Sequence, residues 1–560
     1  MREKKTPESG ESTDEMGGGP GRWAATYRAA ACYPPCNPSV PKDMLPKAKN
    51  EWTVEEAAHL VRRAGFGGSP DQIARIHAMG REAAVDSLLD PDEPQDAIPL
   101  PSWYNPARLA EEQRERLEEM RESRTEGRSM TAAERERAQR MARQEAQRTA
   151  RQRLMTASAW WFDRMMRTRA PLREKMVLFL HDHFATSSQK VRQPALMMRQ
   201  NELLREYALG DFRKLTHEIV RDPAMMLYLD TQTSKKGKPN ENFAREVMEL
   251  FTLGEGNYTE KDIKEAARAF TGYTVNRFNG KVSHVKFQWD SGSKTVLGKT
   301  GKFDGDQVVD ILFEQQAAAE YLPSKLWMFF VEDEPPKAVV EELAEGFRAS
   351  GFQLKPLLRE IFLSRAFYDS TVIRNQIKSP IQFLVQMCKE LEVPDLPGGY
   401  EQLAQRELGQ VLFVPPNVAG WDWGRAWINT NTLLSRYNIA GVITQGAVDA
   451  PGTEGGGENM MDQMAEGGGP GMKVVARLVG RNMRDWKGPD YEKLAPRELR
   501  KDPEKLVGSL IARFFQSDPG DKQRGAFVDY AKSKQGVVFT NHEVAELCHL
   551  MMSTPRYQLC

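Results

Sequence analysis

The chain has 560 residues, of which 40% are hydrophobic and 28% are charged. Its 78 basic and 78 acidic side chains cancel, so no overall charge favours nucleic acid or an anionic membrane surface as a partner. No stretch reaches the roughly 20 consecutive apolar residues that a spanning helix needs, which predicts that the chain does not cross a membrane. The chain is longer than a single hydrophobic core usually supports, which predicts several packed units or one elaborated domain.

Residues 1–47 are rich in glycine, proline, serine and charge, which predicts a disordered N-terminal arm. Acids and glycines stand where a signal peptide has its apolar segment, so a cytoplasmic location is the default expectation, with export alongside a partner as an alternative. Cys32 and Cys36 form a lone C-x3-C, which favours a flexible thiol pair over a structural zinc.

Residues 48–105 are expected to begin the helical fold, with Thr53 as one helix N-cap and Ser69-Pro70 starting the next helix. Residues 106–155 consist mostly of Glu, Arg, Gln, Ala and Met. This composition predicts long exposed helices with ion pairs four residues apart. A solvated helical hairpin is favoured over a coiled-coil arm for a partner, because the apolar seam of a coiled coil is missing.

Residues 156–445 carry the densest helical pattern and are predicted to form the core. Within them, alternating Val and Phe positions between turn residues predict a β-hairpin insertion near 273–305. Residues 446–471 are glycine-rich and predict a mobile insertion, and residues 472–560 return to helix. The predicted fold is mainly α, a multi-helical body with a small β-hairpin insertion and a long charged helical arm.

A candidate site for a divalent metal combines histidines and carboxylates from two helices. A helix over 172–180 is expected to end before His181 and His183, where the chain enters the small polar segment ATSSQ. Two histidines one residue apart reach one ion only where the backbone is extended or turning, and a helix end meets this requirement. Glu246 and Glu249 share a face of a helix expected over 242–251, and Asp262 is a further candidate ligand. The alternative for these residues is a buried polar network that locks the helices together. A less favoured alternative is carboxylate acid–base chemistry on a glycan.

A second candidate site follows Phe413, where a loop rich in proline, glycine and tryptophan could bind a glycan by ring stacking and hydrogen bonding to hydroxyls. Its predicted binding residues are Asn417, Trp421, Asp422, Trp423, Trp427 and Asn429. The alternative is a loop that its own tryptophans and Asx-turns hold in place.

Several segments identify a family resemblance. They are PLREKMVLFLHDHFATS, PNENFAREVMELFTLGEGNYTEKDIKEAARAFTGY, GSKTVLGKTGKFDGDQVVDIL, FVPPNVAGWDWGRAWINTNTLLSRYN and the terminal LMMSTPRYQLC. Together they resemble the bacterial family catalogued as "domain of unknown function 1800". The resemblance implies a helical fold without an established catalytic role, and a sulfatase-like protein of the "domain of unknown function 1501" family as a partner.

Two functions remain open from the sequence. The leading interpretation is a partner or assembly protein that acts with the sulfatase-like protein in cell-surface polysaccharide or envelope processes. The alternative is a metal-dependent hydrolase or oxidoreductase that uses the His/Glu site between core helices.

Overall fold

The computed structural model describes residues 45–92, 98–126, 131–277, 279–445, 486–515, 519–534 and 539–560. These residues belong to one compact unit, Leu45–Cys560. Residues 1–44 of the predicted N-terminal arm, with Cys32 and Cys36, and the predicted insertion 446–471 lie outside the described residues. Packing begins by Pro46, whose carbonyl oxygen accepts the Arg365 N–H at 2.8 Å, so the body starts slightly before the predicted boundary at 48.

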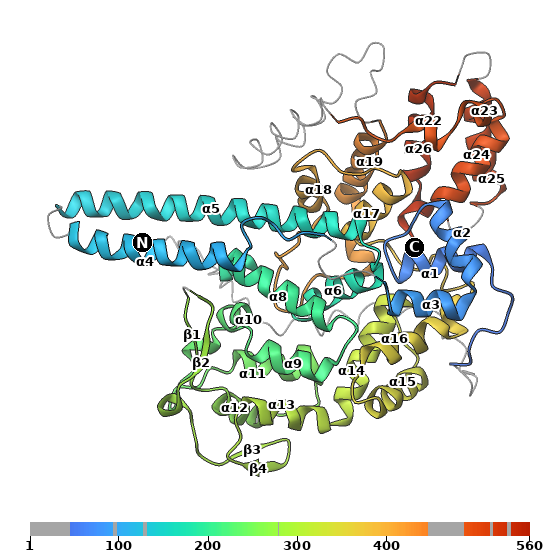
Figure 1. Ribbon diagram of the computed structural model, residues 1–560. Coiled ribbons are helices and arrows are strands. Elements are labelled where there is room, and N and C mark those ends of the chain that lie inside the picture. The colour runs from blue at the N-terminus through green and yellow to red at the C-terminus, as the bar shows by residue number, and fades with distance from the viewer. Residues whose placement is uncertain are drawn as a thin grey trace, which may run out of the picture. The chain divides into compact units, whose positions relative to one another are not determined.

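The predicted fold class is confirmed: the described residues hold 24 α-helices and two small antiparallel sheets (Figure 1). The first helices are α1 (Val54–Arg63), α2 (Pro70–Met79), α3 (Arg81–Leu89), α4 (Pro106–Glu126) and α5 (Ala132–Arg167). Next come α6 (Pro171–His183), α7 (Ser188–Val191), α8 (Pro194–Tyr207), α9 (Phe212–Val220), α10 (Pro223–Tyr228), α11 (Asn242–Glu246), the π-helix η3 (Val247–Thr252) and α12 (Glu260–Ala269).

The helices after the sheets are α13 (Gly305–Glu314), α14 (Gln316–Phe330), α15 (Lys337–Ala349), α16 (Leu354–Leu363), α17 (Pro380–Glu390), α18 (Tyr400–Leu408) and α19 (Thr430–Gln445). The last are α22 (Tyr491–Leu494), α23 (Arg497–Arg500), α24 (Pro503–Phe514), α25 (Asp521–Ser533) and α26 (Asn541–Met552). None of these described helices is long and apolar enough to cross a membrane.

The two predicted helix starts near the N-terminus are confirmed. Thr53 and Ser69 each cap a helix through a capping box, in which the side-chain oxygen accepts an N–H of the first turn and Glu56 or Gln72 reaches back to the cap. This reciprocal bonding satisfies backbone donors that have no partner inside the helix. The sequence therefore fixes α1 and α2 locally.

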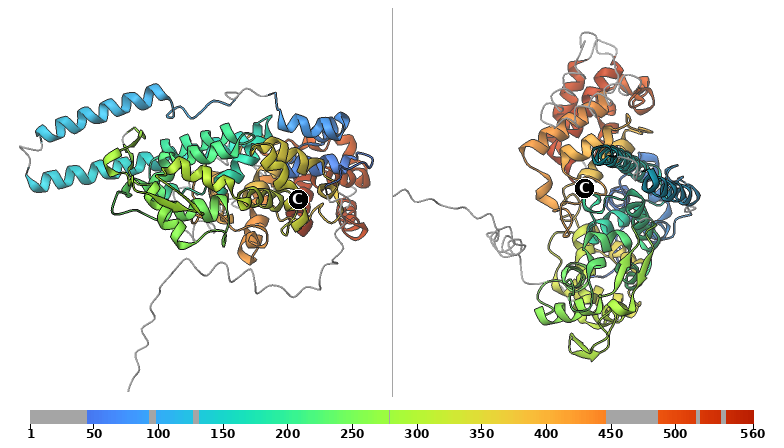
Figure 2. Two further views of the ribbon diagram at one scale, coloured as in Figure 1. Left: turned by 90° about the horizontal axis from the view of Figure 1, so that it is seen from below. Right: turned by 90° about the vertical axis from the view of Figure 1, so that its left-hand side faces the viewer.

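The helices α4 and α5 form the charged arm and extend together from the body (Figures 1 and 2). Every residue from Thr131 to Arg148 is exposed, as expected for a solvated hairpin. The side chains of Arg153 and Glu112 join the two helices at 2.6 Å. The helix α5 crosses the predicted boundary at 155 without interruption, and its last turns are buried from Ala157 to Met166 apart from Ala159 and Asp163. The core therefore holds the arm through a continuous helix.

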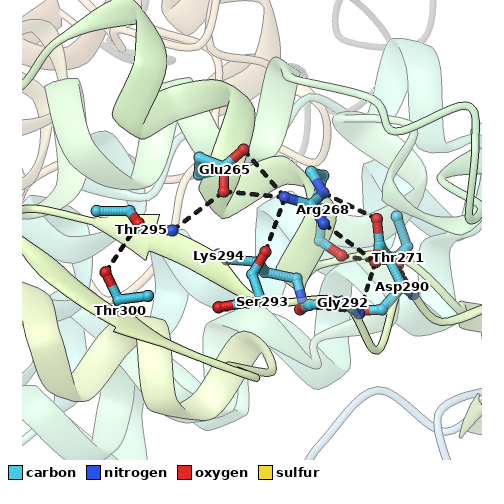
Figure 3. Close-up of polar contacts among 9 residues, drawn as sticks. All are labelled: Glu265, Arg268, Thr271, Asp290, Gly292, Ser293, Lys294, Thr295 and Thr300. Carbon is cyan, nitrogen blue, oxygen red and sulfur yellow. Dashed lines mark hydrogen bonds and ion pairs between the residues drawn. The ribbon is translucent and has the colours of Figure 1, made fainter.

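The predicted β insertion consists of two hairpins. Strand β1 (Tyr273–Val275) pairs with β2 (Val282–His284), and β3 (Lys294–Val296) pairs with β4 (Lys299–Gly301). Figure 3 shows how Arg268 of α12 fastens this region: its guanidinium donates to Asp290 at 2.8 Å and to Glu265 at 2.9 Å. Glu265 also accepts the Thr295 N–H at 3.0 Å, which ties β3 to the helix.

Candidate functional site

The helix α6 carries the first candidate site and lies at the centre of the core, buried from Glu174 to His183. The prediction that this helix ends at Leu180 is wrong, because α6 includes both histidines and the Phe184 N–H still donates to Leu180 O at 2.8 Å. Residues two apart on an α-helix point to nearly opposite sides. His181 and His183 therefore lie in different surroundings.

His181 faces α5 and the segment after α18. Its Nε2 accepts the backbone N–H of Phe413 at 3.2 Å, and its ring centroid lies 5.3 Å from that of Trp161 and 5.7 Å from that of Trp421. Burial lowers the pKa of His181 to about 3, so the ring is neutral. His181 therefore serves as a buried hydrogen-bond acceptor.

His183 faces the π-helix η3 on the other side. Its Nε2–H donates to Phe251 O at 3.0 Å, and the ring packs among Phe179, Phe184 and Phe212. Burial, with a smaller effect of the Lys325 charge, holds the pKa of His183 well below its usual value. The Nδ1 atom has no hydrogen-bond partner among the described residues. This neutral ring fastens α6 to η3.

The three carboxylates predicted as metal ligands make different contacts. Glu246 ends α11 and Glu249 lies in η3, where its Oε2 accepts the Tyr258 hydroxyl at 2.5 Å. Burial, followed by the Glu249 charge, raises the pKa of Glu246 to about 7. Asp262 belongs to the capping box of α12, and its Oδ1 accepts the Leu297 N–H at 2.7 Å.

The five predicted metal ligands therefore do not form one cluster. Across the described ranges no three His, Cys, Asp or Glu side chains are placed to hold a metal ion together. The physical reason is the helical backbone at residues 181–183, which turns the two imidazoles apart. The observed bonds of His181 and His183 agree with the alternative of a buried polar network that holds helices together.

Asp182, between the two histidines, joins α6 to the loop after Phe413 that carries Trp421, Trp423 and Trp427, here called the tryptophan loop. Its Oδ1 accepts the Trp421 N–H at 2.7 Å, and its Oδ2 accepts the Trp423 indole N–H at 2.7 Å. Burial raises the pKa of Asp182 to about 6, against the opposing effect of the Lys325 charge. The histidine end of the first candidate and the loop of the second are thus joined, and sequence reasoning missed the residue that joins them. An acidic residue inside an apolar helix was the available signal.

The other predicted residues of this loop have different roles: some accept local backbone N–H groups, one is exposed, and one is buried. The Asn417 side chain accepts the Ala419 N–H at 2.8 Å in an Asx-turn, and Asn429 accepts the Thr432 N–H at 3.0 Å at the start of α19. Asp422 is exposed and Trp427 is buried. These contacts agree with a loop pinned by its own Asx-turns and tryptophans.

Trp423 and Trp427 line a small cavity with Asp182, Lys175 and Gln382. Its volume is about 70 Å³, which holds a few water molecules rather than a sugar ring. Lys175 is buried in its wall, and burial lowers the pKa of this ammonium to about 8. The cavity lies at a polar junction between α6 and the loop.

Gly420 shows how closely the loop approaches α6. Its φ is +88°, and a Cβ at this position would overlap the Asp182 carboxylate. We expect Gly420→Ala to lower the free energy of unfolding by about 2–4 kcal/mol, because backbone strain adds to overpacking. Gly409→Ala is the matched control, since its φ is +87° and nothing lies within 4 Å of the added Cβ. Equal losses in urea unfolding of the two variants would show that the close approach costs nothing.

Comparison with known families gives one result. The family model described as "Protein of unknown function (DUF1800)" matches residues 59–559. No curated protein and no solved structure shows significant similarity to the chain.

Proposed function

We propose that this chain, which belongs to the DUF1800 family of proteins of unknown function, is a partner or assembly protein. It acts with a sulfatase-like protein of the "domain of unknown function 1501" family in cell-surface polysaccharide or envelope processes. The exposed arm of α4 and α5 is the observation that supports the proposal.

The arm is built as a surface for another molecule. A helix that is polar on all sides gains little from packing and is typical of a bridge to another body. In the exposed part of α5, ion pairs such as Arg140–Glu136 at 2.9 Å lie four residues apart and stabilise the helix by only a few tenths of a kcal/mol, roughly. Two large apolar side chains, Leu117 and Met141, are 48% and 61% exposed on the arm. We take these two side chains as contact points for the partner, because apolar area that is buried on binding favours association.

The site on α6 supports the same role. His181, Asp182 and His183 all make hydrogen bonds that hold the tryptophan loop or the π-helix in place. His181 also packs against Trp161 in the buried end of α5, the helix that carries the arm, with the two ring centroids 5.3 Å apart. The predicted metal-dependent hydrolase or oxidoreductase depends on ligands that are directed to separate partners, so we propose the binding role.

The test measures binding of the purified sulfatase-like protein from the same genome to immobilised full-length chain. We expect the double variant Leu117→Glu, Met141→Glu to weaken binding about tenfold or more, because buried apolar anchors carry most of the affinity. The matched control is Val54→Glu, Met79→Glu, which changes two apolar residues that are 53% and 46% exposed outside the arm. All four positions are exposed, so both variants should keep the native melting temperature. Absence of binding by the native chain, or equal weakening in both variants, would refute the proposal.

A further inference from the structure

A broad groove lies at the base of the arm. Its walls come from residues 144–155 of α5, from residues 188–194 of α7 and the start of α8, and from residues 406–414 at and after the end of α18. Figure 1 shows α5 passing between α8 and α18. The cavity has a volume of about 920 Å³, which lies in the upper range of ligand-binding clefts.

The charge of the groove is of one sign. Four arginines line it and no acidic residue does: Arg148, Arg151, Arg192 and Arg406. All four are exposed, and none forms an ion pair with a carboxylate of the described residues. The Arg192 Nε–H donates to Gln189 O at 3.2 Å, so the two terminal NH₂ groups of this guanidinium can bind a ligand. Because the chain as a whole has no net charge, this concentration of cations is local.

Neutral hydrogen-bonding groups stand between the arginines. Four glutamines line the groove: Gln144, Gln147, Gln189 and Gln193. The Ser188 side chain is 7% exposed, and its Oγ has no hydrogen-bond partner among the described residues. A buried hydroxyl without a partner costs free energy unless a ligand satisfies it. Ser188 therefore offers an unpartnered hydroxyl in the wall of the groove.

The remaining wall is aliphatic and includes Leu154, Met155, Val411 and Val414. No aromatic side chain lines the groove, so it offers no stacking platform of the kind that binds single-stranded nucleic acid. The site on α6 supports this wall through Phe413, whose N–H donates to His181 and whose carbonyl oxygen accepts the Ser188 N–H at 2.9 Å. Phe413 thereby links His181 to the hydroxyl-bearing wall.

We infer that the groove binds an anionic polysaccharide. Guanidinium groups pair in a fork geometry with sulfate or carboxylate groups. Glutamine amides and the Ser188 hydroxyl match sugar hydroxyls, which both donate and accept, and the aliphatic wall accepts the C–H faces of the rings. The choice of a polysaccharide deepens the proposed function and rests on it. The arginine, glutamine and serine set is separate from the apolar arm residues that the partner assay tests.

The experiment uses the full-length chain and calorimetric titration with dextran sulfate and polygalacturonate. Uncharged dextran, poly-L-glutamate and single-stranded DNA serve as parallel probes. We expect at least one of the two anionic glycans to bind more tightly than all three parallel probes, and the affinity to fall as salt screens the charges. Failure of both glycans to bind, or equal or tighter binding of the polypeptide or DNA, would overturn the inference.

Two variants locate the site. Arg148→Glu, Arg151→Glu should weaken glycan binding about tenfold or more, since two charge-assisted contacts become repulsive. Its matched control, Arg114→Glu, Arg116→Glu, makes the same charge change on exposed α4 outside the groove and should change affinity less than about twofold. Ser188→Ala tests the hydroxyl without altering charge or adding volume, and should weaken binding without lowering the melting temperature. Equal effects of the two charge reversals would place binding elsewhere. The partner assay is independent, because its variants leave the groove intact.

Discussion

Glu174→Gln is expected to lower the free energy of unfolding by about 3–5 kcal/mol, the cost of leaving a buried charge without its counterion. Glu174 lies fully buried on α6 between two buried arginines. Its Oε1 accepts from Arg164 and from Arg205, each at 2.7 Å, and its Oε2 accepts the Trp161 indole N–H at 3.1 Å. Glutamine would remove the negative charge and turn an amide N–H₂ toward these donors.

The balance of charge between Glu174 and its two arginines, Arg164 and Arg205, explains the size of the expected stability loss. Burial alone would raise the pKa of Glu174, but Arg205 and Arg164 outweigh burial and hold the pKa below its usual value. Arg164 belongs to α5 and Arg205 to α8, so the carboxylate sets the spacing of two helices whose other turns line the arginine groove. Loss of the carboxylate should therefore loosen the base of the arm and weaken glycan binding.

Urea unfolding followed by circular dichroism measures the stability change. Glu136→Gln is the matched control, because Glu136 pairs with Arg140 at 2.9 Å on the exposed arm, where both side chains are more than 60% exposed. An exposed pair contributes about 0–1 kcal/mol, so this control should unfold almost like the native chain. A Glu174→Gln variant as stable as the control would contradict the role of the cluster.

Asp182 should add a pH-dependent part to the stability of the native chain, and Asp182→Asn should remove that part. The folded pKa of about 6 exceeds the ordinary value of 3.8 because burial disfavours the charged form. Between these two values the folded chain binds more protons than the unfolded chain, so the free energy of unfolding falls as pH rises through this window. The contribution is present below the ordinary pKa and is lost above about pH 6.

The expected size is up to about 3 kcal/mol, since each unit of pKa difference corresponds to about 1.4 kcal/mol. The measurement is the free energy of unfolding of the native chain minus that of Asp182→Asn, from about pH 4 to 7. Other buried carboxyls contribute to both proteins and cancel in this difference. The control Asp71→Asn changes an exposed residue of α2 and should give a nearly flat difference. A difference for Asp182→Asn that is flat or that rises with pH would contradict the prediction.

Local sequence signals determined much of the fold. Thr53 and Ser69 start α1 and α2 by bonding to their own first turns, which requires no distant residue. The composition of residues 106–155 predicts exposed helices because side chains four residues apart suffice to stabilise them. Turn residues and alternating Val and Phe positions near 273–305 likewise predict β-hairpins, and the structure has two of them. The family that the sequence segments resemble is the one whose model matches the chain.

The tertiary structure alone decided the sites. The position at which α6 ends could not be predicted from the sequence. The helix continues for three residues beyond Leu180, which directs His181 and His183 to opposite sides. The same three residues place Asp182 where its carboxylate accepts the Trp421 N–H of the tryptophan loop. The groove is assembled from segments near residues 150, 190 and 410. Its local positive charge could not be predicted from a sequence whose net charge is zero. Local hydrogen bonds are encoded by neighbours in the sequence, whereas the direction of a buried side chain depends on the packing of distant segments.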